Sequence, residues 1–178
     1  MSSCVARMAG ICLCLTAGCG HGGDAQTTAA GSKASPAVGK AALSEVDACK
    51  IVSREEVEAA VGWKVDSTGP GSAQFAGSAC NFYGKTISDL VGVAIANQGF
   101  VGMNSSAQLA AFFSDTAKHG MFAVDAKPVD DLGVPAAEFE MGWFVVTALG
   151  KDQRRVDVTS PSEAASKSLI KKVLARLP

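Results

Sequence analysis

Histidine and surplus basic charge are both scarce in this sequence, and each shortage excludes a class of function. The chain has two histidines, His21 and His119, which lie far apart. A structural zinc site takes about four His, Cys or carboxylate ligands, so no metal site is predicted, and no motif indicates a cofactor. Sixteen Lys and Arg residues face seventeen Asp and Glu residues. No basic patch carries interleaved aromatic residues, so nucleic acid is not an expected partner.

Familiar catalytic motifs are missing as well. The sequence contains no Gly-x-Ser-x-Gly elbow, no Walker-type phosphate loop and no zinc motif. Gly99–Gly102 lacks the strand-Gly-helix context of a phosphate loop. Asp130 and Asp131 are adjacent, and neighbouring side chains on an extended backbone point apart, so we expect a solvated turn. His119 is expected at a helix end. The sequence therefore predicts no catalytic residue and no enzyme.

The sequence also has no long hydrophobic run, and the apolar stretch near its N-terminus is short. The apolar stretch over residues 8–17 follows a single cation, Arg7, and the α-amino group. It is too short for a bilayer span, which takes about 20 apolar residues. Its length instead suits the hydrophobic part of an export signal. It closes on Thr16-Ala17-Gly18-Cys19.

This closing sequence resembles the lipobox of bacterial lipoproteins, a pattern of Leu-small-small-Cys. Thr16 departs from the preferred Leu, although Leu15 lies one residue earlier. The resemblance implies that the Cys19 thiol receives a diacylglycerol and that the chain is cut before Cys19. An ordinary secretory signal cut at a nearby small residue, or a cytosolic start, are the alternatives. In a Gram-negative envelope, Gly20 in place of Asp would imply the outer membrane.

Three segments follow from this interpretation. Residues 1–18 are a lipoprotein signal peptide, 19–44 are the lipidated cysteine and a flexible tether, and 45–178 are a globular domain. The tether is rich in Gly, Ala, Ser and Thr and has no aromatic residue. Such a segment buries too little apolar surface to offset its ordering entropy, so it should hold the domain away from the lipid headgroups.

Of the six cysteines, only two remain available for pairing within the domain. Signal cleavage would remove three of them, and Cys19 would carry lipid. Cys49 and Cys80 are left, and an exported compartment is oxidising. We expect these two to form one disulfide; the alternative is two separately buried thiols.

Three segments carry helix signals. Ser53 and Glu56 have the spacing of a capping box before a short helix over 54–61. Ser105 and Gln108 repeat that spacing before a second helix. The third is expected to begin with Ser160 as N-cap, Pro161 at the first helical position and Glu163 at the third. Its apolar stripe, from Ala165 to Leu177, should pack on a sheet, while a helix lying on a membrane is a minor alternative.

Alternating apolar residues predict strands between these helices. The clearest runs are 78–83, 90–96, 136–140, 143–149 and 154–159, with weaker candidates at 63–65, 74–76 and 122–124. Trp63 and Trp143 fall in such runs and are expected as core or half-core residues. The cluster Ser67–Gly71 is predicted as a turn, and Lys127–Gly133 as a connection. With no βαβ rhythm, the fold class is α+β: an antiparallel sheet packed with about three helices and one disulfide.

The order of these features resembles small bacterial cell-envelope lipoproteins of uncharacterised function that are common in actinobacteria. The features are the lipobox, the tether, Asp47-Ala48-Cys49 before a short acidic helix, Cys80-Asn81-Phe82, and Val129–Gly133 before the last strands. Phe82 stands where many relatives have Trp. The resemblance covers most of residues 47–177, and it implies a compact α+β domain with a disulfide and no known active site.

We therefore expect an exported protein, anchored by Cys19 to the bacterial cell membrane or outer membrane, with its domain facing the periplasm or the exterior. Besides the bilayer, its expected partners are another envelope protein or a small apolar ligand. A non-catalytic binding or interaction domain is the favoured function. The alternative is a small hydrolase-like envelope enzyme whose active site is dispersed along the chain.

Overall fold

The structure is a computed structural model that describes residues 45–178 apart from 73–76, 98–99, 101 and 120–123, with the backbone alone for 116–119. These residues belong to a globular unit over Ala41–Pro178. The described helices are α1 (Ala48–Ile51), α2 (Arg54–Val61), α3 (Ser106–His119) and α4 (Glu163–Arg176). The described strands are β1 (Ser67–Pro70), β2 (Gly77–Tyr83), β3 (Leu90–Ala96), β4 (Lys127–Pro128), β5 (Ala136–Glu140), β6 (Phe144–Leu149) and β7 (Arg155–Ser160). The α+β class is confirmed.

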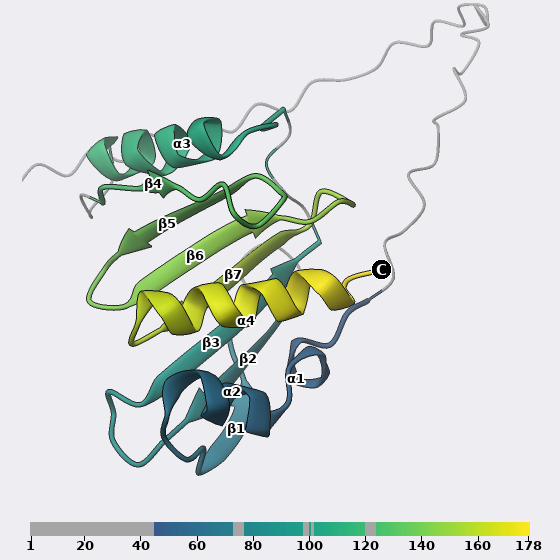
Figure 1. Cartoon of the computed structure of the whole chain (residues 1–178), viewed down its shortest axis with the longest axis vertical. Helices are drawn as coiled ribbons and strands as arrows, with labels where there is room; N and C mark the ends of the chain where they lie inside the picture. The colour runs from purple at the N-terminus through teal and green to yellow at the C-terminus, as the bar shows by residue number, and fades with distance from the viewer. Residues whose placement is uncertain (1–44, 73–76, 98–99, 101, 120–123) are drawn as a thin grey trace, which may run out of the picture. The chain divides into compact units, whose positions relative to one another are not determined.

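The seven described strands form one antiparallel sheet in the order β1-β2-β3-β7-β6-β5-β4. Two meanders, β1 to β3 and β4 to β7, meet where β3 pairs with β7 (Figure 1). In this register Val158 of β7 lies opposite Val93 of β3 and Val146 of β6. The last strand in the chain therefore occupies the centre of the sheet, with partners on both sides.

One face of the sheet, called the near face here, carries the main core. Val93, Val146 and Val158 point to it, and each is at most 1% exposed. Helices α1, α2 and α4 pack on this face, with α4 lying across the strands (Figure 1). The α4 residues buried there are Ala165, Ser166, Leu169, Ile170 and Val173. The predicted packing of the last helix on a sheet is confirmed, and its apolar stripe is not presented to a membrane.

The start of α4 differs from the prediction. Its N-cap is Ser162, whose hydroxyl accepts a hydrogen bond from the Ala165 amide. Ser160 instead continues β7, opposite Phe144 of β6. Its buried hydroxyl lies 2.8 Å from that of Ser166. Ser160 therefore pairs within the sheet instead of capping α4. The additional strand pairing stabilises the fold more than a cap at Ser160 would, because Ser162 supplies the cap instead.

The capping box of α2 is confirmed. The Ser53 hydroxyl accepts from the Glu56 amide, and the Glu56 carboxylate accepts from the Ser53 amide. Gly62 ends the helix with φ of +79°, a left-handed conformation that costs glycine little. Glu56 also binds α4, since both of its oxygens accept from the Arg176 guanidinium at 2.6 and 2.7 Å. This helix start therefore carries an interhelical contact as well as a cap.

Several local predictions were wrong. Ser67–Gly71 contains an edge strand, β1, where we expected only a turn, and 127–128 form a second edge strand, β4. Residues 63–65 are not a strand, and a one-turn helix, α1, precedes α2. The candidates at 74–76 and 122–123 lie outside the described residues. Both edge strands end in proline, which lacks the amide that a further strand would need.

Candidate functional site

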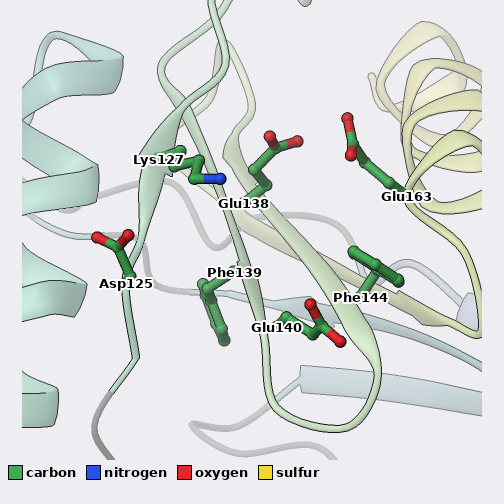
Figure 2. A pocket seen from close by; sticks show the side chains of 7 residues that line it. All are labelled: Asp125, Lys127, Glu138, Phe139, Glu140, Phe144 and Glu163. Atoms are coloured by element: carbon green, nitrogen blue, oxygen red, sulfur yellow. The ribbon is translucent and has the colours of Figure 1, made fainter.

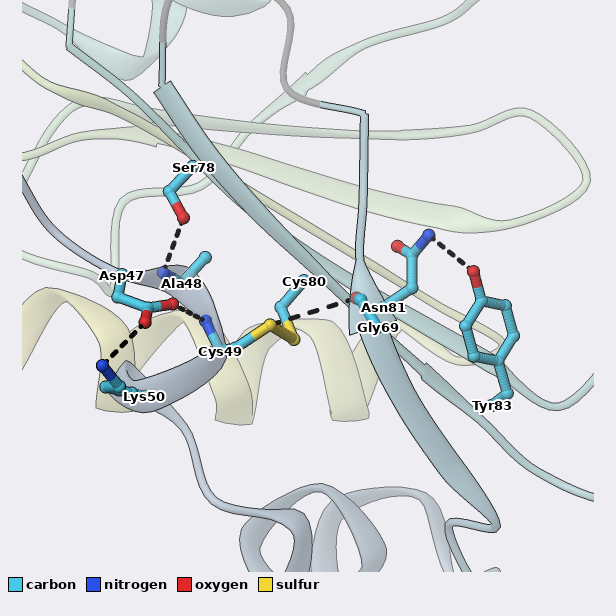
Figure 3. Close-up of a disulfide and its surroundings, with 9 residues drawn as sticks. All are labelled: Asp47, Ala48, Cys49, Lys50, Gly69, Ser78, Cys80, Asn81 and Tyr83. Atoms are coloured by element: carbon cyan, nitrogen blue, oxygen red, sulfur yellow. Dashed lines mark hydrogen bonds and ion pairs between the residues drawn. A yellow bond between two sulfur atoms is a disulfide. The ribbon is translucent and has the colours of Figure 1, made fainter.

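Of the predicted site residues, Cys49 and Cys80 are brought together. They form a disulfide with Cα atoms 4.9 Å apart, which confirms the predicted pair (Figure 3). Cys80 is fully buried in β2, whereas Cys49 is exposed on α1. The Asp47 carboxylate caps α1 through the Cys49 amide, and the Ser78 hydroxyl accepts from the Ala48 amide. The bridge and these hydrogen bonds fasten the entrance of the domain to β2.

The predicted lipidation residue, Cys19, lies outside the described residues, and so does His21. Within the described part of the chain, no helix is both long enough and apolar enough to cross a bilayer. His119 is the last residue of α3, and its side chain is not described. The prediction of lipid attachment to Cys19 therefore stays a prediction.

Two other sequence candidates have structural roles. The Asp131 carboxylate pairs with Lys171 of α4 at 2.8 Å, and this hydrogen bond lowers the pKa of Asp131. Asp130 is exposed and has no part in that contact. Trp63 is half-buried against the near-face core. Neither the aspartates nor Trp63 lines a described hollow.

The second face of the sheet, called the far face, is only partly covered by the described helices. Helix α3 contacts β4 and β5 there, and Leu109 and Ala110 pack with Ala137 and Leu149. Aromatic rings extend this cluster, with the Phe113 and Phe139 centroids 5.1 Å apart. No described helix covers the far face over β2, β3 and β7. That uncovered part carries small or polar side chains: Ala79, Asn81, Gly92, Ala94, Asp157 and Thr159.

A hollow of about 270 Å³ lies at the border between the covered and uncovered parts, and is called the far-face hollow below. Three neighbouring strands supply its central residues, since Asp157 of β7 lies opposite Ala94 of β3 and Thr147 of β6. Its described lining consists of Ser72, Ala94, Phe113, Phe139, Val145, Thr147, Arg155 and Asp157. Half of these side chains are apolar, and two of the polar ones, Thr147 and Arg155, contact Asp157.

The Asp157 carboxylate has one partner on each oxygen. Oδ1 accepts from the Thr147 hydroxyl at 2.7 Å, and Oδ2 pairs with the Arg155 Nε at 2.7 Å. The Arg155 guanidinium also lies 5.6 Å from the centre of the Phe100 ring. Burial raises the pKa of Asp157, an effect opposed by the Arg155 charge and the Thr147 hydrogen bond. The site thus holds a poorly solvated carboxylate in a hollow with apolar walls.

A second hollow, also of about 270 Å³, lies beside β4, β5 and the start of α4, and is called the acidic hollow. Figure 2 shows Glu138 of β5 and Glu163 of α4 directed toward each other. The Lys167 ammonium binds both carboxylates at 2.6 Å. Both hydrogen bonds raise the pKa of Lys167, and the one to Glu138 has the larger effect. The remaining lining is Asp125, Lys127, Phe139, Glu140 and Phe144.

The two hollows differ in the chemistry they offer. In the acidic hollow a lysine already binds two of the carboxylates and offsets one of their two charges, which is the arrangement of a solvated ion network. The described residues contain no group of three or more His, Cys, Asp or Glu side chains placed to hold a metal ion. The far-face hollow combines apolar walls with a few convergent polar groups, the usual character of a small-molecule site.

Sequence reasoning did not find the far-face hollow. Its central residues, Ala94, Thr147 and Asp157, come from three strands and meet only through the register of the sheet. One signal was present: in 155–159 the apolar residues alternate with Arg155, Asp157 and Thr159, which indicates that the second face of this strand is polar. That signal does not show which side chains lie opposite.

In comparisons with known proteins, no protein-family model, no curated protein and no solved structure matches the chain.

Proposed function

We propose that this protein is a lipid-anchored component of a bacterial cell envelope whose globular domain binds a ligand without catalysing a reaction. The observation that carries the binding role is the far-face hollow, which lies where α3 stops covering the sheet. The sequence supports the location, through the short apolar run that ends in Thr16-Ala17-Gly18-Cys19. The disulfide supports export, because such bonds persist in oxidising compartments.

The near face supports a scaffold role for the remainder of the domain. Its core, the disulfide and the α2–α4 contact all lie on the side of the sheet opposite the hollow. A rigid sheet then presents Ala94, Thr147 and Asp157 at fixed positions. Binding sites on strands are held more accurately than sites on loops, so this arrangement suits recognition.

A small hydrolase-like enzyme is the alternative function, and the acidic hollow is the observation that favours it. Paired carboxylates are the usual acid and base of glycoside hydrolysis. Glu138 and Glu163 face each other, but both bind Lys167. The Lys167 hydrogen bond lowers the pKa of Glu163, whereas a general acid must hold a proton. The binding role is therefore the better supported of the two.

The anchor is tested on the mature N-terminus. Intact-mass and peptide mass spectrometry of protein isolated from its own membranes should find diacylglycerol on Cys19. Cys19→Ser should move the protein from the membrane to the soluble fraction without changing its unfolding transition. An unmodified mature N-terminus at another residue would overturn the anchoring part of the proposal.

The binding role is tested by filling the far-face hollow. Ala94→Leu adds a branched side chain at its centre, and Ala59→Leu is the matched control at an exposed position of α2. Wild-type, variant and control proteins are isolated from native membranes and compared by native mass spectrometry for co-purifying small molecules. We expect a bound species in wild type and in Ala59→Leu that is lost in Ala94→Leu. Equal occupancy in all three would refute a role for this hollow.

A further inference from the structure

The position of Asp157 restricts what the far-face hollow can bind, and this inference rests on the proposed binding role. Asp157 lies on the central strand of the sheet, with paired strands on both sides. Charged side chains are rarely buried without a partner, because their desolvation is costly. Here Arg155, two residues along the same strand, supplies the opposite charge, and Thr147 on the next strand supplies a hydroxyl donor.

These contacts leave acceptor capacity on the carboxylate. An ionised carboxylate has two oxygens with about four lone-pair directions in all. The described contacts use one direction on each oxygen, toward Thr147 and Arg155. The carboxylate lines an open hollow, so the remaining directions are available to a donor on a bound molecule. Burial, which raises the pKa of Asp157, indicates that its charge is poorly solvated and would gain from such a donor.

The charge balance of the hollow selects against ions. The Arg155 guanidinium and the Asp157 carboxylate cancel at 2.7 Å from each other. A cation would approach Arg155 as well as Asp157, and an anion would approach Asp157 as well as Arg155. A net-charged ligand would thus lose its hydration without a net countercharge in the described lining. An uncharged ligand avoids this cost.

The walls and the size of the hollow define the rest of the ligand. Phe113 and Phe139 form one wall, with their rings tilted by 39°, and Val145 and Ala94 contribute aliphatic surface. At about 270 Å³ the hollow is just below the usual range for drug-sized ligands. Aromatic walls favour a flat ring, which packs against them with little loss of conformational entropy.

We propose that the far-face hollow binds a small uncharged molecule that combines a flat apolar ring with one hydrogen-bond donor, and that the Asp157 carboxylate receives this donor. Asp157 thereby determines specificity, while Phe113, Phe139 and Val145 supply most of the contact area. A molecule of the same shape without the donor would leave the desolvated carboxylate with less compensation, and should bind more weakly.

The test uses indole and 1-methylindole, which share the ring and differ in the donor. The full chain carrying Cys19→Ser is titrated with each probe, and binding is followed by NMR at the Ala94, Val145 and Thr147 methyl groups. We expect indole to bind about tenfold more tightly, as one hydrogen bond to a charged acceptor allows. Tryptamine and indole-3-acetate, a cation and an anion of the same ring, should bind no more tightly than indole.

Two variants locate the effect. Ala94→Leu should abolish binding of both probes, whereas the control Ala59→Leu should leave both unchanged. Asp157→Asn, whose folding is checked by thermal unfolding, should reduce the preference for indole because it removes the charged acceptor. If indole and 1-methylindole bind wild type equally, the role of Asp157 is overturned while the hollow remains a binding site. If neither binds, yet Ala94→Leu loses the molecule that co-purifies with wild type, the ligand class is wrong and the binding function stands.

Discussion

Adjacent valines on β6 illustrate the difference between the two faces of the sheet. Val146 points into the near-face core and is fully buried, whereas Val145 lines the far-face hollow and is half-buried. Three of the four described helices pack on the side of Val146, and only α3 packs on the other. The near face therefore supplies most of the stability, and the far face is free to carry polar groups that stability alone would not select.

The two faces also place ion pairs in different surroundings. On the near-face side Glu56 binds Arg176 and Lys172 at the surface. These contacts lower the pKa of Glu56 to about 2, and the Arg176 hydrogen bond has the largest effect. On the far face Asp157 also binds an arginine, but burial raises its pKa. The two carboxyl groups thus shift in opposite directions although each binds an arginine, because desolvation is the largest influence on the pKa of Asp157 and the Arg176 hydrogen bond is the largest influence on that of Glu56.

The largest expected effect comes from breaking the covalent clamp on the near-face side. Cys49→Ala or Cys80→Ala releases α1 from β2 and should lower the free energy of unfolding by about 2–4 kcal/mol. Urea unfolding followed by circular dichroism measures it. Attachment to membranes should be unchanged, because the proposed anchor is a different cysteine, Cys19. A loss below about 0.5 kcal/mol would mean that the hydrogen bonds of Ala48 and Cys49 hold this segment unaided.

Val146→Ala and Val145→Ala compare the faces within one strand. The first leaves a cavity in a closed core and should cost about 2–3 kcal/mol, while the second widens an open hollow and should cost under about 1 kcal/mol. The two substitutions change strand propensity and side-chain size by the same amount. The difference between the variants in the free energy of unfolding therefore reports the face alone. Equal costs in urea unfolding would contradict the division into a stabilising face and a binding face.

Glu56→Gln weakens the α2 cap and its contact with α4. We expect a loss of about 1–2 kcal/mol at neutral pH. Because the folded pKa of about 2 lies below the ordinary value of 4.5, this stabilisation is complete above the ordinary pKa and is lost as pH falls toward the folded pKa. Wild type and variant should therefore converge in stability near pH 2 to 3. A gap that stays constant between pH 7 and pH 3 would rule out the carboxylate as its source.

Local patterns predicted much of this fold. The capping box identified α2, and alternation gave β3 with its observed ends. Setting aside the three cysteines of the predicted signal peptide and the predicted lipidated Cys19 gave the pair Cys49 and Cys80. In each case the determining interactions lie within a few residues or follow from the predicted compartment. The turn predicted at Gly69 and Pro70 failed because it rested on local residues alone. This segment is an edge strand only because it pairs with β2.

The candidate site was beyond such reasoning. Thr147 and Asp157 touch because β6 and β7 pair in one register, and Ala94 joins them from β3 of the other meander. A shift of one residue in either pairing would turn Asp157 toward the core and leave the hollow without its carboxylate. Alternation in 155–159 shows that one side is polar, but only the sheet order shows what that side faces.

The smallest expected effect is the pH dependence that Asp157 contributes, and its sign is opposite to that of Glu56. Burial raises the folded pKa of Asp157 above the ordinary value of 3.8, so the folded protein holds this proton more strongly than the unfolded chain does. The associated stabilisation is complete below pH 3.8 and is lost as pH rises through the folded pKa.

Asp157→Asn mimics the protonated group and removes this titration. Relative to wild type, the variant should gain stability as pH rises from about 3 into the neutral range. Because Asn also leaves the Arg155 charge without its opposite partner, the gain is measured from the stability gap between the two proteins at about pH 3. Urea unfolding of both proteins at matched pH values measures the difference. Arg155 and Thr147, the groups that face this carboxylate, oppose the effect of burial, so Thr147→Val should enlarge the pH dependence. The stability gap between Asp157→Asn and wild type could instead change with pH in the same direction as that of Glu56→Gln. Desolvation would then not dominate the pKa of Asp157, and the contrast between the faces would fail at this position.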